Sequence, residues 1–250
     1  MNRIDKIKGK FSIMTHVVAG YPDMNATREL ILEMVKSGVD LIEIQIPFSD
    51  PLADGSTIME ASQQALDNGV TVKDCFDLVS SVRDKIDIPL LFMSYVNIPF
   101  KYGLEAFVSG CKKVGIDGLI IPDIPFDERL DYIKIADAKG VYPIHVVSPD
   151  VSNSRLQSVI KVSKGFIYTT LKVGITGAGK EISDEGKNFV KKLKQQTSLP
   201  VLAGFGVSSK EHVNQLKKIA DGAVIGSHIL NLLNSHGRES VSEFLVSLKK

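Results

Sequence analysis

The sequence has no tryptophan, only two cysteines and no long apolar run. Cys75 and Cys111 lie in helix-like segments without the spacing of a metal site, so we expect buried free thiols and exclude redox and zinc chemistry. No apolar run approaches the ~18 residues that a membrane-spanning helix needs. The first residues, MNRIDKIKGKFSIM, carry charges throughout and lack the apolar centre of a signal peptide, so we expect a cytoplasmic protein.

The sequence also lacks a large excess of positive or negative charge. The chain has 30 Lys+Arg and 29 Asp+Glu, which gives a formal net charge of +1. Such a chain has no global field that would attract nucleic acid or an anionic membrane, so any anionic ligand must be held by a local site. The 250 residues, 44% of them hydrophobic, suit one large domain over residues 1–250 rather than two small ones.

Short apolar, β-branched runs recur along the chain and predict strands. They are SIMTHVV (12–18), DLIEIQI (40–46), IPLLFMSY (88–95), DGLIIPD (117–123), VYPIHVV (141–147), FIYTT (166–170), LPVLAG (199–204) and DGAVIG (221–226). Between them lie stretches with helix periodicity, and several of these end on the glycine typical of a helix C-terminus: ATRELILEMVKSG, LEAFVSGCKKVG, DERLDYIKIADAKG and EHVNQLKKIADG.

The alternation of strand and helix predicts the fold. Strands that are too apolar to have a wet face indicate a parallel sheet covered by helices. Eight such units in 250 residues fit a single-domain (β/α)8 TIM barrel better than an open sheet. In this fold the active site lies at the C-terminal ends of the strands and in the loops after them, so candidate residues are sought there.

Glycine-rich turns follow the last three predicted strands. Backbone N–H groups at glycines and at the positive end of a helix suit a phosphate, although each turn alone is equally typical of a tight strand-to-helix connection. Barrels often hold phosphate in the loops after strands seven and eight, so the turns together predict a phosphate site. The turns are VGITGAGK (173–180), AGFGVSS (203–209) and VIGSH (224–228), and the candidate residues are Gly177, Gly206, Gly226 and Ser227.

Two carboxylates stand at the end of the second predicted strand. In DLIEIQI, alternation puts the three isoleucines on one face and Glu43 and Gln45 on the other. If the isoleucines face the helices, Glu43 points into the barrel, where burial disfavours its charged form and lets it donate a proton near neutral pH. Asp54, in the loop DPLADG, would lie at the rim of the mouth. Each residue also has an ordinary explanation, a Glu paired with a lysine or hydroxyl and an Asp in a turn or helix cap.

The run PFSDPLADG (47–55), preceded by a strand Glu, resembles the tryptophan synthase alpha chain family. Further matches follow in the family's order over essentially the whole chain: YVN (95–97), PDIP (122–125), GITG (174–177), GFG (204–206) and GS (226–227). The first motif is highly specific, whereas the glycine motifs are shared with other phosphate-binding barrels. The resemblance implies retro-aldol cleavage of indole-3-glycerol phosphate to indole and glyceraldehyde 3-phosphate in tryptophan biosynthesis, with no cofactor in this chain.

The resemblance also implies roles for single residues. Glu43 and Asp54 fall on the catalytic carboxylates of the family's motif, and Tyr168 falls on its active-site tyrosine. Glu43 would protonate indole C3, and Asp54, ionised at the rim, would accept the hydrogen bond of the indole N–H. The indole pocket is expected to include Tyr95, Ile120 and Phe205, although core packing is the commoner role of such side chains.

A protein partner is implied as well. The family's partner is the pyridoxal-phosphate-dependent beta chain, in an alpha-beta-beta-alpha heterotetramer. We expect the beta chain to dock on the loop around Asp50 and Pro51, where it could order Asp54 and so act allosterically.

Several positions depart from the family's pattern. Gln45 stands where the family usually has glycine, and its amide could either tune the neighbouring acid or take space that the substrate needs. The other departures are Leu171 and Lys172 in place of a Ser-Arg pair, and Thr15 and Val18 in place of Pro and Thr. Two alternative functions therefore stay open. One is a catalytically weak regulatory or channelling subunit that activates the beta chain, and the other is another phosphate-binding barrel, an isomerase or indole-glycerol-phosphate synthase, although those families lack PFSDPLADG.

Overall fold

The computed structural model describes residues 2–172, 174 and 182–249. Eight parallel strands form a closed barrel in the order β1 to β8, with β1 pairing against β8. All eight predicted strands are confirmed, and with them the (β/α)8 barrel. The strands are β1 (Ser12–Val18), β2 (Leu41–Gln45), β3 (Leu90–Met93), β4 (Gly118–Ile120), β5 (Tyr142–Val147), β6 (Ile167–Thr170), β7 (Val201–Gly204) and β8 (Gly222–Ile225).

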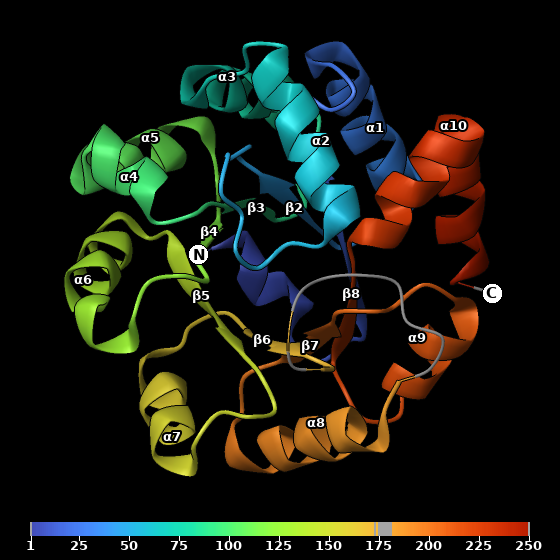
Figure 1. Ribbon diagram of the computed structural model, residues 1–250. Coiled ribbons are helices and arrows are strands. Elements are labelled where there is room, and N and C mark those ends of the chain that lie inside the picture. Colours follow the sequence, from blue (N-terminus) through green and yellow to red (C-terminus); the bar gives the residue numbers. More distant parts are fainter. Residues whose placement is uncertain (1, 173, 175–181, 250) are drawn as a thin grey trace.

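The helices form an outer ring around the strands (Figure 1). Two helices follow β2 and two follow β3, so the described part of the chain has more helices than a simple alternation requires. The helices are α1 (Met24–Lys36), α2 (Ser56–Asp67), α3 (Val72–Arg83), α4 (Asn97–Tyr102), α5 (Leu104–Val114), α6 (Leu130–Lys139), α7 (Asn153–Val162), α8 (Asp184–Gln196), α9 (Lys210–Leu216) and α10 (Ser227–Ser247), with short 3-10 helices at Arg3–Ile7 and Phe126–Glu128.

Most of the predicted helix ends are confirmed. Helices α5 and α6 end on Gly115 and Gly140, which take the left-handed backbone conformation that glycine adopts readily. The prediction for EHVNQLKKIADG is wrong, because α9 stops at Leu216 and Gly222 is the first residue of β8. Gly222 is required by close packing of the strands, since a Cβ there would lie 2.5 Å from the carbonyl oxygen of Ser12 on β1.

Side chains of the strands alternate between two apolar clusters. Ile42 and Ile44 pack between the barrel and the helices, whereas Leu41, Leu91 and Leu202 fill the barrel interior. Both faces of the strands are therefore buried, which explains why their sequences are apolar almost throughout. The prediction that Glu43 shares the inward face is consistent with this alternation.

The two cysteines lie on helices α3 and α5, as predicted. Both are free and fully buried. Burial raises the pKa of the Cys75 thiol to about 12, so the reactive thiolate form is not accessible near neutral pH. These cysteines pack as small apolar side chains.

The N-terminal 3-10 helix, Arg3–Ile7, closes one end of the barrel. Ile4 and Ile7 are buried in the interior cluster. In Figure 1 this helix, drawn in dark blue, accordingly lies near the centre of the view, inside the ring of helices. Because this segment fills the end where the strands begin, access to the interior is left at the opposite end, where the strands finish.

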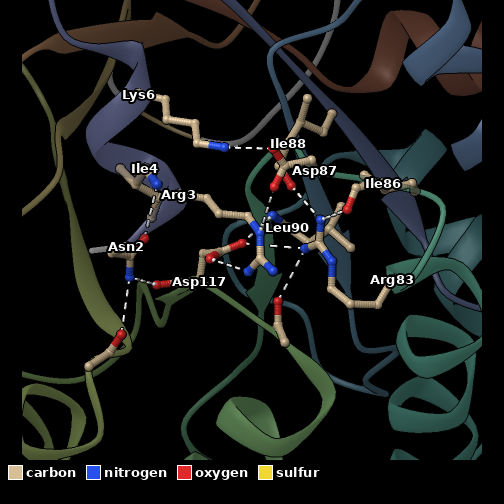
Figure 2. Close-up of polar contacts among 12 residues, drawn as sticks. Asn2, Arg3, Ile4, Lys6, Arg83, Ile86, Asp87, Ile88, Leu90 and Asp117 are labelled. Carbon is tan, nitrogen blue, oxygen red and sulfur yellow. Dashed lines mark hydrogen bonds and ion pairs between the residues drawn. The ribbon is translucent and has the colours of Figure 1, made fainter.

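Asp117 anchors this N-terminal segment. It lies just before β4 and accepts hydrogen bonds from Arg3 Nη1 and from the backbone N–H of Leu90, both at 3.1 Å. Arg83 Nη1 lies 3.4 Å from its second oxygen. Figure 2 shows the two arginines converging on this buried carboxylate, while Asp87 bridges Arg3 and Lys6.

Candidate active site

A cavity of about 240 Å³ lies at the C-terminal ends of the strands, a size suited to a small molecule rather than a macromolecule. Its walls combine apolar side chains with a few converging polar groups, which is the usual composition of a ligand site. The polar side chains are His16, Glu43, Gln45, Asp54, Ser148, Tyr168 and Thr170, and the apolar ones include Ile58, Met93, Ile120, Val146 and Phe205.

Glu43 lines this cavity, as the alternation of β2 predicts. It is the register partner of His16 on β1, and its Oε2 lies 3.2 Å from His16 Nδ1, with both side chains buried. The partner of Glu43 is therefore an imidazole, not the lysine or hydroxyl of the ordinary explanation. Burial lowers the pKa of His16, but the charge of Glu43 and the hydrogen bond to it outweigh burial and raise the pKa above its ordinary value.

Asp54 is held by two side chains from neighbouring elements. Its Oδ2 accepts a hydrogen bond from Gln45 Nε2 at 2.8 Å and another from the Tyr95 hydroxyl at 2.9 Å. The Tyr95 hydroxyl in turn accepts the backbone N–H of Ala53 at 3.0 Å. The N-cap of helix α2 is Gly55, so Asp54 is not the N-cap residue of this helix.

Asp54 lies in the loop after β2 and lines the cavity, as predicted, but it is buried there. Only 4% of the residue is exposed. Burial raises the pKa of Asp54, and the charge of His16 and the hydrogen bonds from Gln45 and Tyr95 offset this only in part. The loop after β2 folds over the cavity and removes this carboxylate from water.

Tyr168 and Phe205 form one wall of the cavity. Tyr168 lies within β6, and its ring meets that of Phe205 edge to face, with centroids 6.3 Å apart. Burial, together with the charges of Glu43 and Asp54, raises the pKa of Tyr168 well above its ordinary value, so the phenol is neutral. Gly204 makes room for it, because a Cβ there would lie 2.8 Å from the Tyr168 hydroxyl.

The three residues expected around an indole ring have different positions. Ile120 and Phe205 line the cavity. Tyr95 is fully buried and is not among the lining residues of the described chain; its ring stacks on Phe48 with centroids 5.3 Å apart. Tyr95 therefore contacts Asp54 and supports the loop, rather than forming the cavity wall.

The glycine-rich turns contribute unequally to the cavity. Gly226 lines it and precedes Ser227, the first residue of α10. Phe205 and Gly206 have φ of 73° and 106°, so the turn after β7 places a non-glycine residue in the left-handed region and points its ring at Tyr168. Gly206 itself is not among the lining residues, and Gly177 lies outside the described residues.

Comparison with known proteins identifies the family. A family model described as tryptophan synthase alpha chain matches residues 3–248. The chain belongs to the tryptophan synthase alpha chain family. The predicted family is therefore confirmed, and with it the class of enzyme, because this family carries indole-3-glycerol phosphate lyase activity in tryptophan biosynthesis.

Relatives match over the full length of the chain. The tryptophan synthase alpha chain of Caldanaerobacter subterraneus subsp. tengcongensis is 40% identical, over 100% of this chain and 99% of the relative. That of Syntrophotalea carbinolica is 42% identical, over 95% and 94%. A crystal structure of tryptophan synthase from M. tuberculosis, in its aminoacrylate-bound form, superposes with a TM-score of 0.90 at 28% identity and covers 99% of this chain and 98% of that one.

Most departures from the pattern of the tryptophan synthase alpha chains are accommodated outside the cavity. Leu171 is buried against the helices, and Lys172 is exposed. Val18 packs with Ile58 and Leu230 beneath α2, and Thr15 is fully buried on the outward face of β1. Gln45 alone among the departures in the described chain lines the cavity, where it contacts Asp54 rather than Glu43.

The loop expected to meet the beta chain exposes one of the two predicted residues, Asp50, but not Pro51. Asp50 is exposed and accepts a hydrogen bond from Ser49 Oγ at 2.5 Å. Pro51 is buried, so it offers no surface, whereas the next residue, Leu52, is 80% exposed.

Across the described ranges no group of three or more His, Cys, Asp or Glu side chains could hold a metal ion. No described helix is long and apolar enough to cross a membrane.

His16 was not among the residues predicted from the sequence, although a signal for it exists. His16 occupies an inward position of β1, and inward positions of neighbouring parallel strands lie side by side. A histidine on that face is therefore a candidate neighbour of Glu43. Thr170 was also missed; it lines the cavity, and its Oγ1 has no hydrogen-bond partner among the described residues.

Proposed function

We propose that this chain cleaves indole-3-glycerol phosphate in the cavity at the C-terminal end of the barrel. The observation that carries the proposal is the pair of buried carboxylates, Glu43 and Asp54, on the wall of a mostly apolar cavity. The reaction needs an acid for a carbon atom and an acceptor for an N–H group, and two carboxylates in different surroundings can divide these tasks. The family supports the same reaction.

Glu43 is the general acid and base of this mechanism. The carboxyl donates a proton to indole C3, which turns the ring into an indoleninium cation. The carboxylate then takes the proton of the neighbouring glycerol hydroxyl, and the electron pair of that O–H bond forms the carbonyl of glyceraldehyde 3-phosphate. The electron pair of the broken carbon–carbon bond returns to the ring and restores neutral indole. One proton is given and one is regained, so Glu43 ends as it began.

Asp54 stabilises the charge that develops on the ring. The indole N–H becomes strongly acidic once C3 is protonated, and a carboxylate that accepts its hydrogen bond stabilises the cation where the charge appears. Gln45 and Tyr95 both donate to Asp54 Oδ2, which fixes the orientation of the carboxylate before substrate binds. A fixed acceptor needs no reorganisation during the reaction.

The remaining parts of the substrate suit the remaining walls. The flat indole ring fits between apolar side chains such as Ile120 and Phe205, and the neutral phenol of Tyr168 can hydrogen bond to the glycerol chain. Backbone N–H groups at Gly226 and Ser227, where α10 begins, would bind the phosphate, together with those at Gly206. Gly177 is proposed for the same role from the sequence motif alone.

Turnover by the isolated chain tests the proposed function. Purified protein is mixed with indole-3-glycerol phosphate, and indole and glyceraldehyde 3-phosphate are measured separately. Equal amounts of both products are expected, and Asp54→Asn should slow their release. Absence of turnover by the chain with and without a partner would contradict the proposal, and turnover only after a beta chain is added would favour the regulatory alternative. Turnover of a different sugar phosphate would favour another barrel enzyme.

We also propose a partner, the pyridoxal-phosphate-dependent beta chain, in an alpha-beta-beta-alpha heterotetramer. The surface that supports it lies on the cavity side of the barrel, where Leu52 after β2 and Phe100 on α4 are each 80% exposed. Large exposed apolar side chains beside a site are typical of a docking surface. Indole is small and uncharged, so direct delivery to a second active site prevents its loss by diffusion. We further propose a cytoplasmic location, because the reaction belongs to amino-acid biosynthesis.

A further inference from the structure

His16 contacts Glu43, the acid of the proposed reaction, and its imidazole can itself carry a proton. Among the histidines of the described residues, it is the one that lines the cavity. Its Nδ1 is 3.2 Å from Glu43 Oε2, and neither side chain is more than 6% exposed. Its Nε2 is buried without a hydrogen-bond partner in the described part of the chain. The imidazole is thus fixed on one side by Glu43 and faces the cavity region on the other.

A proton between these two atoms has two positions. In one, an imidazolium donates from Nδ1 to a carboxylate; in the other, a neutral carboxyl donates to Nδ1. The two states differ only in where one proton lies along the contact, and in both Nε2 keeps its own hydrogen. A buried pair of this kind titrates as a unit, so the proton belongs to the pair rather than to either residue.

We propose that His16 is a positioning residue that shares one proton with Glu43 and so keeps this proton available at a pH at which a carboxyl alone would have lost it. The catalytic consequence rests on the proposed function, because it concerns the proton that Glu43 gives to indole C3. When the pair donates to C3 and regains the hydroxyl proton, it holds the same number of protons before and after the reaction.

The surroundings of His16 favour this sharing. The charged or titratable groups that face it are Glu43 on β2 and Asp54 in the following loop, both carboxylates. On its other side, β8 and the turn after it contribute Gly226, where a Cβ would lie 3.6 Å from His16 Cβ. Tyr168, from β6, faces the same two carboxylates and is neutral. No described cation competes with the imidazole for Glu43.

Titration of His16 in the intact protein tests the pairing without any substrate. Side-chain 15N signals of the five histidines are followed against pH, and His16 is assigned by its loss in His16→Asn. We expect His16 to keep its proton above the ordinary histidine value of about 6.5, and Glu43→Gln to lower its midpoint by about one unit or more. A wild-type midpoint at or below 6.5 would overturn the inference even if a variant fails to fold. A raised midpoint that Glu43→Gln leaves unchanged would overturn it as well.

The pH profile of kcat/KM tests the consequence for catalysis. His16→Asn keeps a donor near the position of Nδ1 but cannot share a proton, so the basic limb of the profile should move by about one unit or more toward lower pH, with KM little changed. His16→Phe removes the donor too and should also lower kcat. The matched control is His236→Gln, at an exposed histidine on α10, which should leave the profile unchanged.

These outcomes separate the inference from the proposed function. Coupled titration in a chain that does not cleave indole-3-glycerol phosphate would support the pairing and contradict the function. Normal cleavage with the same basic limb in His16→Asn as in His236→Gln would support the function and overturn proton sharing by His16.

Discussion

The side-chain amide of Gln45 donates a hydrogen bond to Asp54 Oδ2 across 2.8 Å, which links the end of β2 to the loop that follows it. The same nitrogen lies 3.3 Å from Ser62 Oγ on α2. Gln45 stands where the family resemblance predicts glycine, and its donor is directed at Asp54, not at Glu43. Of the two roles considered for this amide, tuning and crowding, the contacts support a constructive one.

Gln45→Ala should therefore lower activity rather than raise it. Loss of a hydrogen bond to a charged group typically costs about 1.5–3 kcal/mol, which corresponds to at least a ~10-fold fall in kcat if the bond orients Asp54 in the transition state. Steady-state cleavage of indole-3-glycerol phosphate measures this. Ser62→Ala is the control, because it removes only the longer contact and should change kcat by less than about threefold. A rise in activity in Gln45→Ala would instead mean that the amide crowds the substrate.

Glu43→Gln should abolish most of the cleavage and leave binding intact. A positioned general acid contributes about 10²- to 10⁴-fold, and the amide keeps the shape of the side chain without its proton. The expected pattern is a fall in kcat with KM little changed, measured by single-turnover and steady-state kinetics. Glu60→Gln, at an exposed position of α2, is the matched control and should behave as wild type. Normal turnover in Glu43→Gln would remove this residue from the mechanism.

The sequence predicts the barrel because each strand is an apolar run that can be recognised locally. Glu43 could also be found, since period-two alternation places it opposite the isoleucines of its own strand. The partners of the two carboxylates could not be predicted in the same way. The contacts of Glu43 with His16 and of Asp54 with Tyr95 join residues that are 27 and 41 positions apart, so they depend on strand register and loop path.

The errors have the same origin. The loop DPLADG is polar in sequence and typical of an exposed turn, yet its path over the barrel buries Asp54 and Pro51 and exposes Leu52. Local sequence likewise extended the last predicted helix as far as Gly222, although the chain needs that residue for contact between β8 and β1. Tertiary packing decided both outcomes.

Asp54→Asn should stabilise the protein at neutral pH while it lowers activity. The pKa of Asp54 is raised above its ordinary value of 3.8, so the folded protein holds this proton more tightly than the unfolded chain does. The contribution of Asp54 to stability is thus fully present below pH 3.8 and is lost as pH rises through the raised value. Asparagine removes that loss. We expect a higher Tm than wild type at pH 7 and a difference that vanishes toward pH 3.5; equal Tm values at both pH values would contradict this.

Asp117→Asn should destabilise the barrel at its closed end. The Asp117 side chain is 6% exposed and contacts Arg3 and Arg83, so neutralising it leaves two guanidinium groups without their shared anion. Removal of one partner from a buried ion pair typically costs about 3–5 kcal/mol. Because Arg3 is partly exposed, we expect Asp117→Asn to lower the free energy of unfolding by no more than this amount. Asp87→Asn is the matched control, since the Asp87 side chain is 81% exposed and such surface pairs contribute about 0–1 kcal/mol. Urea unfolding measures both, and equal effects would contradict the anchoring role of Asp117.

Leu52→Glu and Phe100→Glu should each weaken association with the beta chain without changing cleavage by the isolated chain. Both side chains are 80% exposed beside a groove lined by Phe48, Ile98 and Tyr102, so a carboxylate introduced there would lose its hydration on docking. Residues that anchor an interface contribute more than about 1 kcal/mol to the binding free energy, so we expect each glutamate variant to raise Kd at least ~5-fold by titration calorimetry. Asp50→Ala should reduce the acceleration of indole release by the beta chain more than it reduces basal turnover. Val246→Glu, 40% exposed near the C-terminal end of α10, is the control on another helix. If all three glutamate variants bind the beta chain equally well, the docking surface lies elsewhere.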